Sequence, residues 1–478
     1  MTVTRAVVQE RYGSPDVLTV TEIPTPEPGP DDVLVRVRAA SLNARDWHVM
    51  RGEPRLARLI ARDTFGRRGP RAAVGGTDLA GTVQAVGADV NRWQPGDLVF
   101  GEGQGSFAEH AVAPAVDLAE RGVRVGPAQA AVLTILEPIL RRTPASRAIF
   151  QPHGHLLTAD DTLRNPDLGT FLRSLPTAAA RSFYRGPGAM HLATQLAADG
   201  GLLTVDDLAA YRVVERAPLR FEYRGRTVVT NPSPTFGGPL LAIALRRLEA
   251  RGPLAAPGTP EWAESLRDVM AEVDRDRAAA HPEVVEALRP PSGETAGPPA
   301  TRGTTHLTVA DREGNVASMT CSNGECSGDV IDGTGISCNN MLGEDDLHPD
   351  GFHAAPPGVR VASMMSPTFV LGPDGGVDLA LGSGGSKRIR SALLQVITST
   401  VDHGLDLRAA IELPRLHWDR DHTEVEPGLA AATLAALARA APVNPWPAPN
   451  VYFGGVHAVT PGRAGAGDPR RGGAVRVV

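Results

Sequence analysis

Hydrophobic residues follow two different patterns along the chain, and the change between them falls near residue 115. In the first part, short runs of alternating or β-branched residues are separated by turns rich in glycine and proline, which is the pattern of β-strands. Frequent short strands joined by such turns are typical of a small β-barrel. The predicted strands are residues 5–9, 18–22, 32–40, 81–86, 97–101 and 108–113.

The second part combines longer runs of helical periodicity with further strands, which indicates a mixed α/β fold. A tract rich in proline, glycine, threonine and glutamate, residues 282–302, predicts a loose segment just before a strand. The predicted helices are residues 117–122, 127–140, 188–198, 205–211, 238–249, 260–280 and 388–403. The predicted strands are a hairpin over residues 221–230 and residues 304–311, 316–322, 368–371 and 377–381.

Composition excludes several classes of protein. Hydrophobic residues make up 42% and charged residues 21% of the 478 residues, which is typical of a globular chain and not of a disordered one. Aromatic residues are only 4%, and the net charge of −6 offers no basic excess for binding phosphates. We therefore expect no nucleic-acid partner.

The cysteines and the N-terminus bear on location and on metals. Cys321, Cys326 and Cys338 are odd in number and form no CxxC pair, so we expect neither a disulfide framework nor a zinc site. Residues 1–10 lack the basic head and apolar core of a signal peptide, and no apolar run reaches the roughly 20 residues of a membrane span. These features predict a cytoplasmic protein that does not contact a membrane.

Several motifs of the first 115 residues belong together. They are RYGSPDVL at residues 11–18, VLVRVRAASLN at 33–43, GTDLAG at 76–81, PGD at 95–97 and GSFAE at 105–109. This part resembles the GroES-like domain of the zinc-independent medium-chain quinone oxidoreductases and alcohol dehydrogenases. Asn43 lies where zinc-dependent relatives carry a metal-binding cysteine, so the resemblance implies the zinc-free branch.

A reductase of that kind also needs a dinucleotide-binding half with G-x-G-x-x-G after a strand. The glycines at 101, 103 and 105 lie within the predicted barrel. The run from Gly382 to Lys387 follows a strand and precedes a helix, but Lys387 occupies the third glycine position. We therefore expect no cofactor. An NADPH-dependent quinone or alcohol oxidoreductase is kept as an alternative.

A second set of motifs extends over the rest of the chain. They include FYRGP at residues 183–187, NPSPTFGG at 231–238, GTTHLTVAD at 303–311, GSGGS at 382–386, PRLH at 414–417 and GDPR at 467–470. Residues from about 116 to 478 thus resemble the γ-glutamyltransferases (γ-glutamyltranspeptidases), zymogens that cut themselves before a threonine. The resemblance implies an N-terminal-nucleophile (Ntn) hydrolase fold, an αββα sandwich, with the two pieces associated as a heterodimer.

The resemblance also predicts how the chain is divided. Family members carry about a hundred further residues before the matching region, including an arginine that binds the substrate carboxylate, so we expect an incomplete sandwich preceded by the GroES-like β-barrel. The predicted domains are residues 1–115, 116–303 and 304–478. An inactive fusion product of two incomplete enzymes is a further alternative.

The chemistry centres on Thr304. A threonine hydroxyl is a poor nucleophile at its ordinary pKa. Cleavage between Gly303 and Thr304 would give Thr304 a free α-amine, whose unperturbed pKa of about 7.7–8 suits a general base. The resemblance implies that Thr304 then attacks a glutathione-like γ-glutamyl donor, and that water or an amine resolves the resulting ester.

The resemblance assigns the other site residues. Ser322 supplies a second hydroxyl to Thr304, while Gly384 and Gly385 suit an oxyanion hole at the start of a helix. The plainer alternatives are an ordinary serine at a strand end and a tight strand-to-helix turn. The expected substrate-binding residues are Asn323, Glu344, Asp345, Asp346, Ser363 and Met364, where the acidic run is alternatively a solvated turn and Met364 replaces a second serine. His153 and His155 lack a nearby carboxylate or cysteine and are expected to be loop residues without a metal.

Overall fold

The structure is a computed structural model. It describes residues 3–12, 17–30, 32–41, 50, 70, 72–74, 78–88, 90, 94–96, 98–102, 110–113, 119, 122–174, 183–198, 200–288, 304–311, 314–343, 360–462 and 464–475. Within this part of the chain, no helix is long and apolar enough to cross a membrane.

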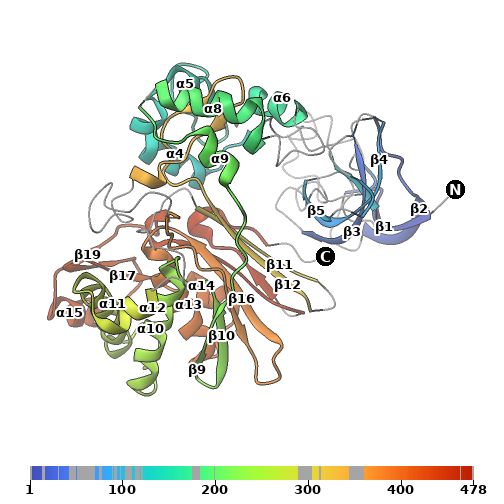
Figure 1. Ribbon diagram of the computed structural model, residues 1–478. Coiled ribbons are helices and arrows are strands. Elements are labelled where there is room, and N and C mark those ends of the chain that lie inside the picture. Colours follow the sequence, from blue (N-terminus) through green and yellow to red (C-terminus); the bar gives the residue numbers. More distant parts are fainter. Residues whose placement is uncertain are drawn as a thin grey trace.

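The described N-terminal part contains short strands, as predicted, and these strands pair antiparallel. One sheet pairs β1 (Val3–Gln9) with β2 (Leu18–Pro24). A second has the order β5-β4-β3-β6, and buried Val33, Val35 and Val83 form the core beside it. Its strands are β3 (Val33–Ser41), β4 (Asp78–Val86), β5 (Leu98–Glu102) and β6 (His110–Ala113). Figure 1 shows these strands together at one side of the molecule.

A group of short helices follows, and Figure 1 shows it at the top of the view. Thr143 caps α5 and Thr204 forms a capping box with Asp207 at α9, so local side chains define both helix starts. The helices are α4 (Pro127–Leu140), α5 (Pro144–Phe150), α6 (Pro166–Ser174), α8 (Pro187–Ala198) and α9 (Val205–Ala210). Two small antiparallel strand pairs accompany them, β7 (Val123–Arg124) with β8 (Thr162–Leu163) and β13 (Val330–Ile331) with β14 (Ile336–Ser337).

The main core lies between a six-stranded sheet and the helices on one of its faces (Figure 1). The sheet has the order β21-β20-β16-β15-β10-β9, and every neighbouring pair is antiparallel. Its strands are β9 (Leu219–Tyr223), β10 (Arg226–Thr230), β15 (Thr368–Leu371), β16 (Val377–Gly384), β20 (Gly455–Thr460) and β21 (Ala464–Ala466).

The helices of this region are buried along their sheet-facing sides. Helix α13 is covered almost throughout, because residues 388–399 are all buried. The helices are α10 (Gly237–Ala250), α11 (Pro260–Ala278), α12 (Pro282–Leu288), α13 (Arg388–Val401), α14 (Leu407–Glu412) and α15 (Ala431–Ala438). A three-stranded sheet, β17 (Leu416–Asp419), β18 (His422–Val425) and β19 (Val443–Pro445), lies beside α11 and α15.

A hairpin of β11 (Thr304–Ala310) and β12 (Val316–Ser322) packs on β16 and β20. The close approach depends on glycine, since a Cβ atom at Gly382 would lie 2.2 Å from the ring of His306. The two sheets therefore stack face to face at this point, and the first residue of β11 lies against the end of β16.

Two predictions about local structure are wrong. Strand β16 continues to Gly384 and does not end at residue 381, so the glycine run is partly strand because it pairs with β20. The tract predicted to be loose contains α12, which buries Val284 and joins Glu283 to Arg247 across 2.6 Å. Tertiary packing outweighs the weak local preference of that segment.

Candidate active site

Thr304 occupies the first position of β11 and is buried, with 6% of its surface exposed. Its Oγ1 lies 3.0 Å from the Oγ of Ser322, because the two residues face each other in the β11–β12 pairing. The backbone N–H of Gly324 donates to the same Ser322 oxygen at 3.1 Å. The Ser322 hydroxyl is thereby held against Thr304 and can stabilise charge that develops on the threonine oxygen.

The end of β16 faces Thr304. A Cβ atom at Gly384 would lie 2.3 Å from the carbonyl oxygen of Thr304, so the two strands approach this closely only with glycine there. Gly385 follows with φ of +129°, which favours glycine, and turns the chain into helix α13. The structure therefore brings Thr304, Ser322, Gly384 and Gly385 together, while their catalytic roles stay predictions.

Arg471 is a neighbour of Thr304 that the sequence did not single out. Its Nη1 donates to the carbonyl oxygen of Thr304 at 3.4 Å, and its Nη2 donates to that of Val451 at 3.3 Å. Burial, and next the charge of Arg388, lower the pKa of Arg471 to about 10, so the guanidinium stays charged at neutral pH. Arg471 directly follows the GDPR motif, but only the fold places it beside Thr304.

His306 lies two residues after Thr304 on β11, and its buried ring has a structural role between the two strands of the hairpin. Its ring is buried and contacts Thr320 Oγ1 and Thr308 Oγ1, each at 2.8 Å. Burial, with a smaller contribution from His457, lowers the pKa of His306 to about 3. The imidazole is therefore neutral at physiological pH and links β11 to β12.

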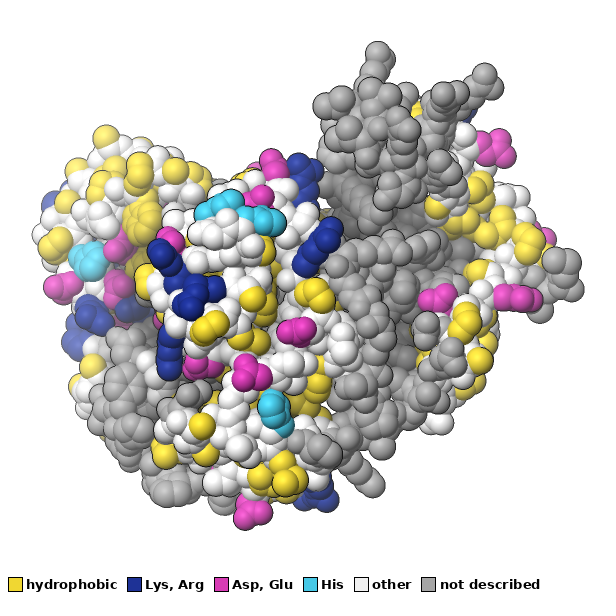
Figure 2. Space-filling view, turned by 90° about the horizontal axis from the view of Figure 1, so that it is seen from above, with side chains coloured by type: hydrophobic (Ala, Val, Ile, Leu, Met, Phe, Trp, Pro, Cys, Tyr) yellow, Lys and Arg dark blue, Asp and Glu magenta, His cyan; other side chains and the backbone are white. Residues whose placement is uncertain are grey.

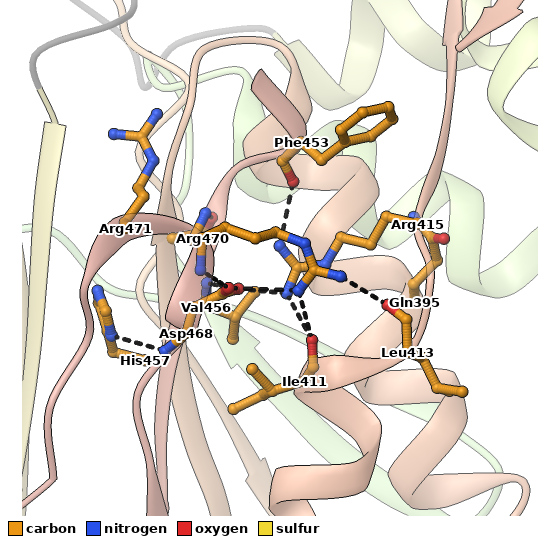
Figure 3. A network of polar contacts seen from close by, with 12 residues as sticks. Gln395, Ile411, Leu413, Arg415, Phe453, Val456, His457, Asp468, Arg470 and Arg471 are labelled. Carbon is orange, nitrogen blue, oxygen red and sulfur yellow. Dashed lines mark hydrogen bonds and ion pairs between the residues drawn. The ribbon is translucent and has the colours of Figure 1, made fainter. Parts of the chain in front are cut away.

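A buried ion-pair network positions the C-terminal segment (Figure 3). Arg415 pairs with Asp468 across 2.5 Å, and Arg470 pairs with Glu426 across 2.5 Å. Arg470 also donates to the carbonyl oxygens of Ile411 and Leu413, each at 2.8 Å. Figure 3 shows the adjacent Arg471 with its guanidinium directed away from this network. The network thus anchors the short helix η5 (Pro469–Arg471), which carries Arg471.

Among the other predicted residues, those that the structure describes make no hydrogen bond to Thr304. Asn323 donates from Nδ2 to the carbonyl oxygen of Ser337 at 3.3 Å. Ser363 is buried, and its Oγ has no hydrogen-bond partner among the described residues. Met364 is fully buried in the main core. The predicted residues Gly303, Glu344, Asp345 and Asp346 lie outside the described residues.

The remaining candidates for metal or redox chemistry are separate from the site. The ring centroids of His153 and His155 are 6.2 Å apart, and the described residues contain no cluster that could hold a metal ion. All three cysteines are free thiols.

Acidic and basic side chains are interspersed over the described part of the face seen in Figure 2.

Comparisons with known proteins agree with both resemblances. Residues 100–287 and 258–478 match the family model described as gamma-glutamyltranspeptidase, and residues 29–121 match that of the alcohol dehydrogenase GroES-like domain. The acylase ACY 1 proenzyme of Pseudomonas sp. (strain SE83) is 32% identical over 354 residues, which cover 68% of this chain and 62% of that protein. The glutathione hydrolase proenzyme of Escherichia coli (strain K12) is 31% identical over 371 residues, covering 68% and 63%.

A solved structure supports the same fold. The cephalosporin acylase from Bacillus halodurans is 26% identical and superposes with a TM-score of 0.64, covering 76% of this chain and 73% of its own. The chain spans about 62% of the length of the curated relatives that it matches.

Proposed function

Because the chain belongs to the gamma-glutamyltranspeptidase family, we propose that it cuts itself between Gly303 and Thr304 and then transfers the γ-glutamyl group of a glutathione-like donor to water or an amine. The observation that carries this proposal is the buried Thr304 hydroxyl, 3.0 Å from Ser322 and packed against Gly384. The reaction is a double displacement and needs no cofactor.

In the first half-reaction, the free α-amine of Thr304 accepts the proton of its own hydroxyl. Oγ1 attacks the γ-carbonyl carbon of the donor, and backbone N–H groups near Gly384 and Gly385 stabilise the oxyanion. The leaving amine takes the proton, and a glutamyl ester remains on Thr304. In the second half-reaction, water or an amine attacks this ester and restores the hydroxyl.

The two pieces stay together as a heterodimer after the proposed cut. Strands β9 and β10 precede the cut, whereas the other strands of the six-stranded sheet follow it. Strand β10 pairs with β15 from Thr227–Leu371 to Thr230–Thr368, so one sheet spans both pieces.

The free thiols support a further proposal, a reducing cytoplasmic location.

A second candidate is acyl transfer from donors that lack the amino-acid head group. The relatives include proteins named acylases, and Met364, at the position of an expected second serine, contributes its side chain to the core. Comparing a γ-glutamyl anilide with its analogue lacking the α-amino group separates the two candidates, because only γ-glutamyl transfer requires recognition of that amine.

A reductase function has less support. The run from Gly382 to Gly385 belongs to the end of β16 and to the turn beneath Thr304. Gly382 and Gly384 are explained by the close approach of β11, and Gly385 by the close approach of Gly454 and its positive φ, without a bound dinucleotide.

Self-cleavage is the direct test of the proposed function. Purified protein, incubated at neutral pH and run on a denaturing gel, is expected to yield pieces of 303 and 175 residues (478 − 303). Thr304→Ala is expected to stay whole, whereas Thr305→Ala, the exposed neighbour on the same strand, is expected to be cut. A wild-type chain that is folded but remains uncut would refute the proposal.

A further inference from the structure

Arg471 forms no ion pair with a carboxylate within the described part of the chain. Both of its hydrogen bonds go to backbone carbonyl oxygens, of Thr304 and Val451, and its Nε is buried without a partner there. The two neighbouring arginines of the C-terminal network differ, since Arg415 and Arg470 each pair with a buried carboxylate. The side chain as a whole is half-buried, but its Nε is buried, and a buried part of a cation without a paired carboxylate is costly, which suggests that its charge is used.

The groups around Arg471 leave a positive field at Thr304. Helix α13 contributes Arg388, whose guanidinium lies 4.5 Å from the ring centroid of Tyr452 and adds to the positive charge. Asp468 is the nearest acid in the network, but it already interacts with both Arg415 and Arg470.

The histidines that face the site add no charge at neutral pH. Burial is the main cause that lowers the pKa of His306, on β11, and of His457, on β20. The remaining acid of the network, Glu426, is taken up by Arg470. Among the charged side chains that the structure describes, Arg471 is therefore the one that contacts the first residue of β11.

The distance is short enough for this charge to act on the α-amine that cleavage would create. Arg471 Nη1 lies 3.4 Å from the carbonyl oxygen of Thr304, and the nitrogen of the same residue is then within about 6 Å. At that distance, and with an effective dielectric constant of about 20–40, a unit positive charge favours the neutral amine by about one to two pKa units. A free α-amine has an ordinary pKa of about 7.7–8, so without this effect most of it would be protonated at neutral pH.

We propose that Arg471 is a positioning residue for the nucleophile: it holds the Thr304 carbonyl and keeps the freed α-amine unprotonated, and so able to act as a base, at and below neutral pH. The inference rests on the proposed function, because it requires the cut before Thr304. Arginine suits this role, since its guanidinium does not lose its proton in the working range of pH.

The test measures the amine itself and the reaction separately. Self-cleaved protein is treated with cyanate, which reacts only with unprotonated amines, from about pH 5.5 to about pH 9, and carbamylation of Thr304 is followed by mass spectrometry of the 175-residue piece. The pH dependence of kcat/KM for a γ-glutamyl anilide is recorded in parallel. Arg471→Gln removes the charge, Arg471→Lys keeps it, and Arg408→Gln removes an exposed arginine on α14 as a control.

We expect Arg471→Gln to shift the low-pH decline of both the carbamylation rate and kcat/KM toward higher pH by about one unit, so that carbamylation near pH 6.5 is about five- to tenfold slower. Arg471→Lys and Arg408→Gln are expected to keep the wild-type limb. Equal loss of activity in both Arg471 variants with an unmoved limb would show a merely structural role and refute the inference. Carbamylation that follows this pattern without γ-glutamyl turnover would support the inference and refute the proposed substrate, whereas absence of a Thr304 N-terminus would refute both.

Discussion

Replacing Asp468 with asparagine is expected to destabilise the sandwich strongly. Asp468 has no exposed surface and accepts four hydrogen bonds. Two come from the guanidinium groups of Arg415 and Arg470, at 2.5 Å and 3.3 Å, and two from the backbone N–H groups of Val456 and Arg470. Asparagine has the same shape but no charge, and its amide N–H groups would face donors.

The magnitude follows from the loss of the charge. Removing one partner of a buried ion pair costs about 3–5 kcal/mol, because the remaining cation is left buried without compensation. Exposed pairs contribute about 0–1 kcal/mol, so Glu264→Gln, which breaks the exposed pair with Arg439, is the matched control. Among the described acids, Arg415 and Arg470 would then keep Glu426 as their counter-ion.

Urea unfolding, followed by tryptophan fluorescence, measures the difference. Trp446 is a suitable reporter, since it stacks on Tyr452 at 4.9 Å and contacts Phe453, whose carbonyl oxygen accepts from Arg415. With a slope of about 3 kcal/mol per molar urea, Asp468→Asn is expected to lower the midpoint of this transition by at least about 1 M. A midpoint within the range of the Glu264→Gln control would refute the assigned role of the network.

The same carboxylate predicts an effect of acid. Burial disfavours the charged form of Asp468, but Arg415 and Arg470 outweigh burial and hold its pKa below the ordinary value. The stabilisation is therefore complete above the ordinary aspartate pKa of about 3.9 and is lost as the pH falls below it. The wild-type protein is expected to lose this part of its stability in acid, and Asp468→Asn is expected to lack that loss.

Three further predictions concern the site. Gly384→Ala is expected to abolish self-cleavage, because its Cβ would lie 2.3 Å from the Thr304 carbonyl oxygen, whereas Gly188→Ala, which meets no atom within 4 Å, is expected to be cut on a denaturing gel. His306 stays neutral in the folded state, so between about pH 6.5 and about pH 3 its imidazole gains a proton only on unfolding. The free energy of unfolding therefore decreases as the pH is lowered through this range, by up to about 1.4 kcal/mol per pH unit. Denaturation across this range is expected to show that His306→Gln removes this dependence on pH, and an unchanged dependence would contradict the assignment. Titration with NADPH is expected to give no saturable change in tryptophan fluorescence, and micromolar binding would contradict our interpretation of the glycine run at β16.

Much of the local structure could be predicted because it depends on neighbours in the sequence. Helix α4 and strands β12 and β15 have the predicted bounds, and α10, α11 and α13 differ only at their ends. Periodic apolar positions and capping residues define such elements over a few turns. The family motifs likewise identified Thr304 and Ser322, whose pairing follows from a short hairpin between β11 and β12.

The contacts that complete the site depend on residues distant in the sequence. Arg471 contacts Thr304 although 167 positions separate them in the sequence. The glycines of β16 are required only because β11 packs against them. The GDPR motif ends at Arg470, so no motif singles out Arg471; the fold pairs Arg470 with Glu426 and directs the guanidinium of Arg471 away from the network. The residue types and their order were therefore sufficient to single out Thr304 as the candidate nucleophile. The electrostatic environment of that nucleophile arises only from folding, because it is the sum of charges that packing brings within a few ångströms of one another.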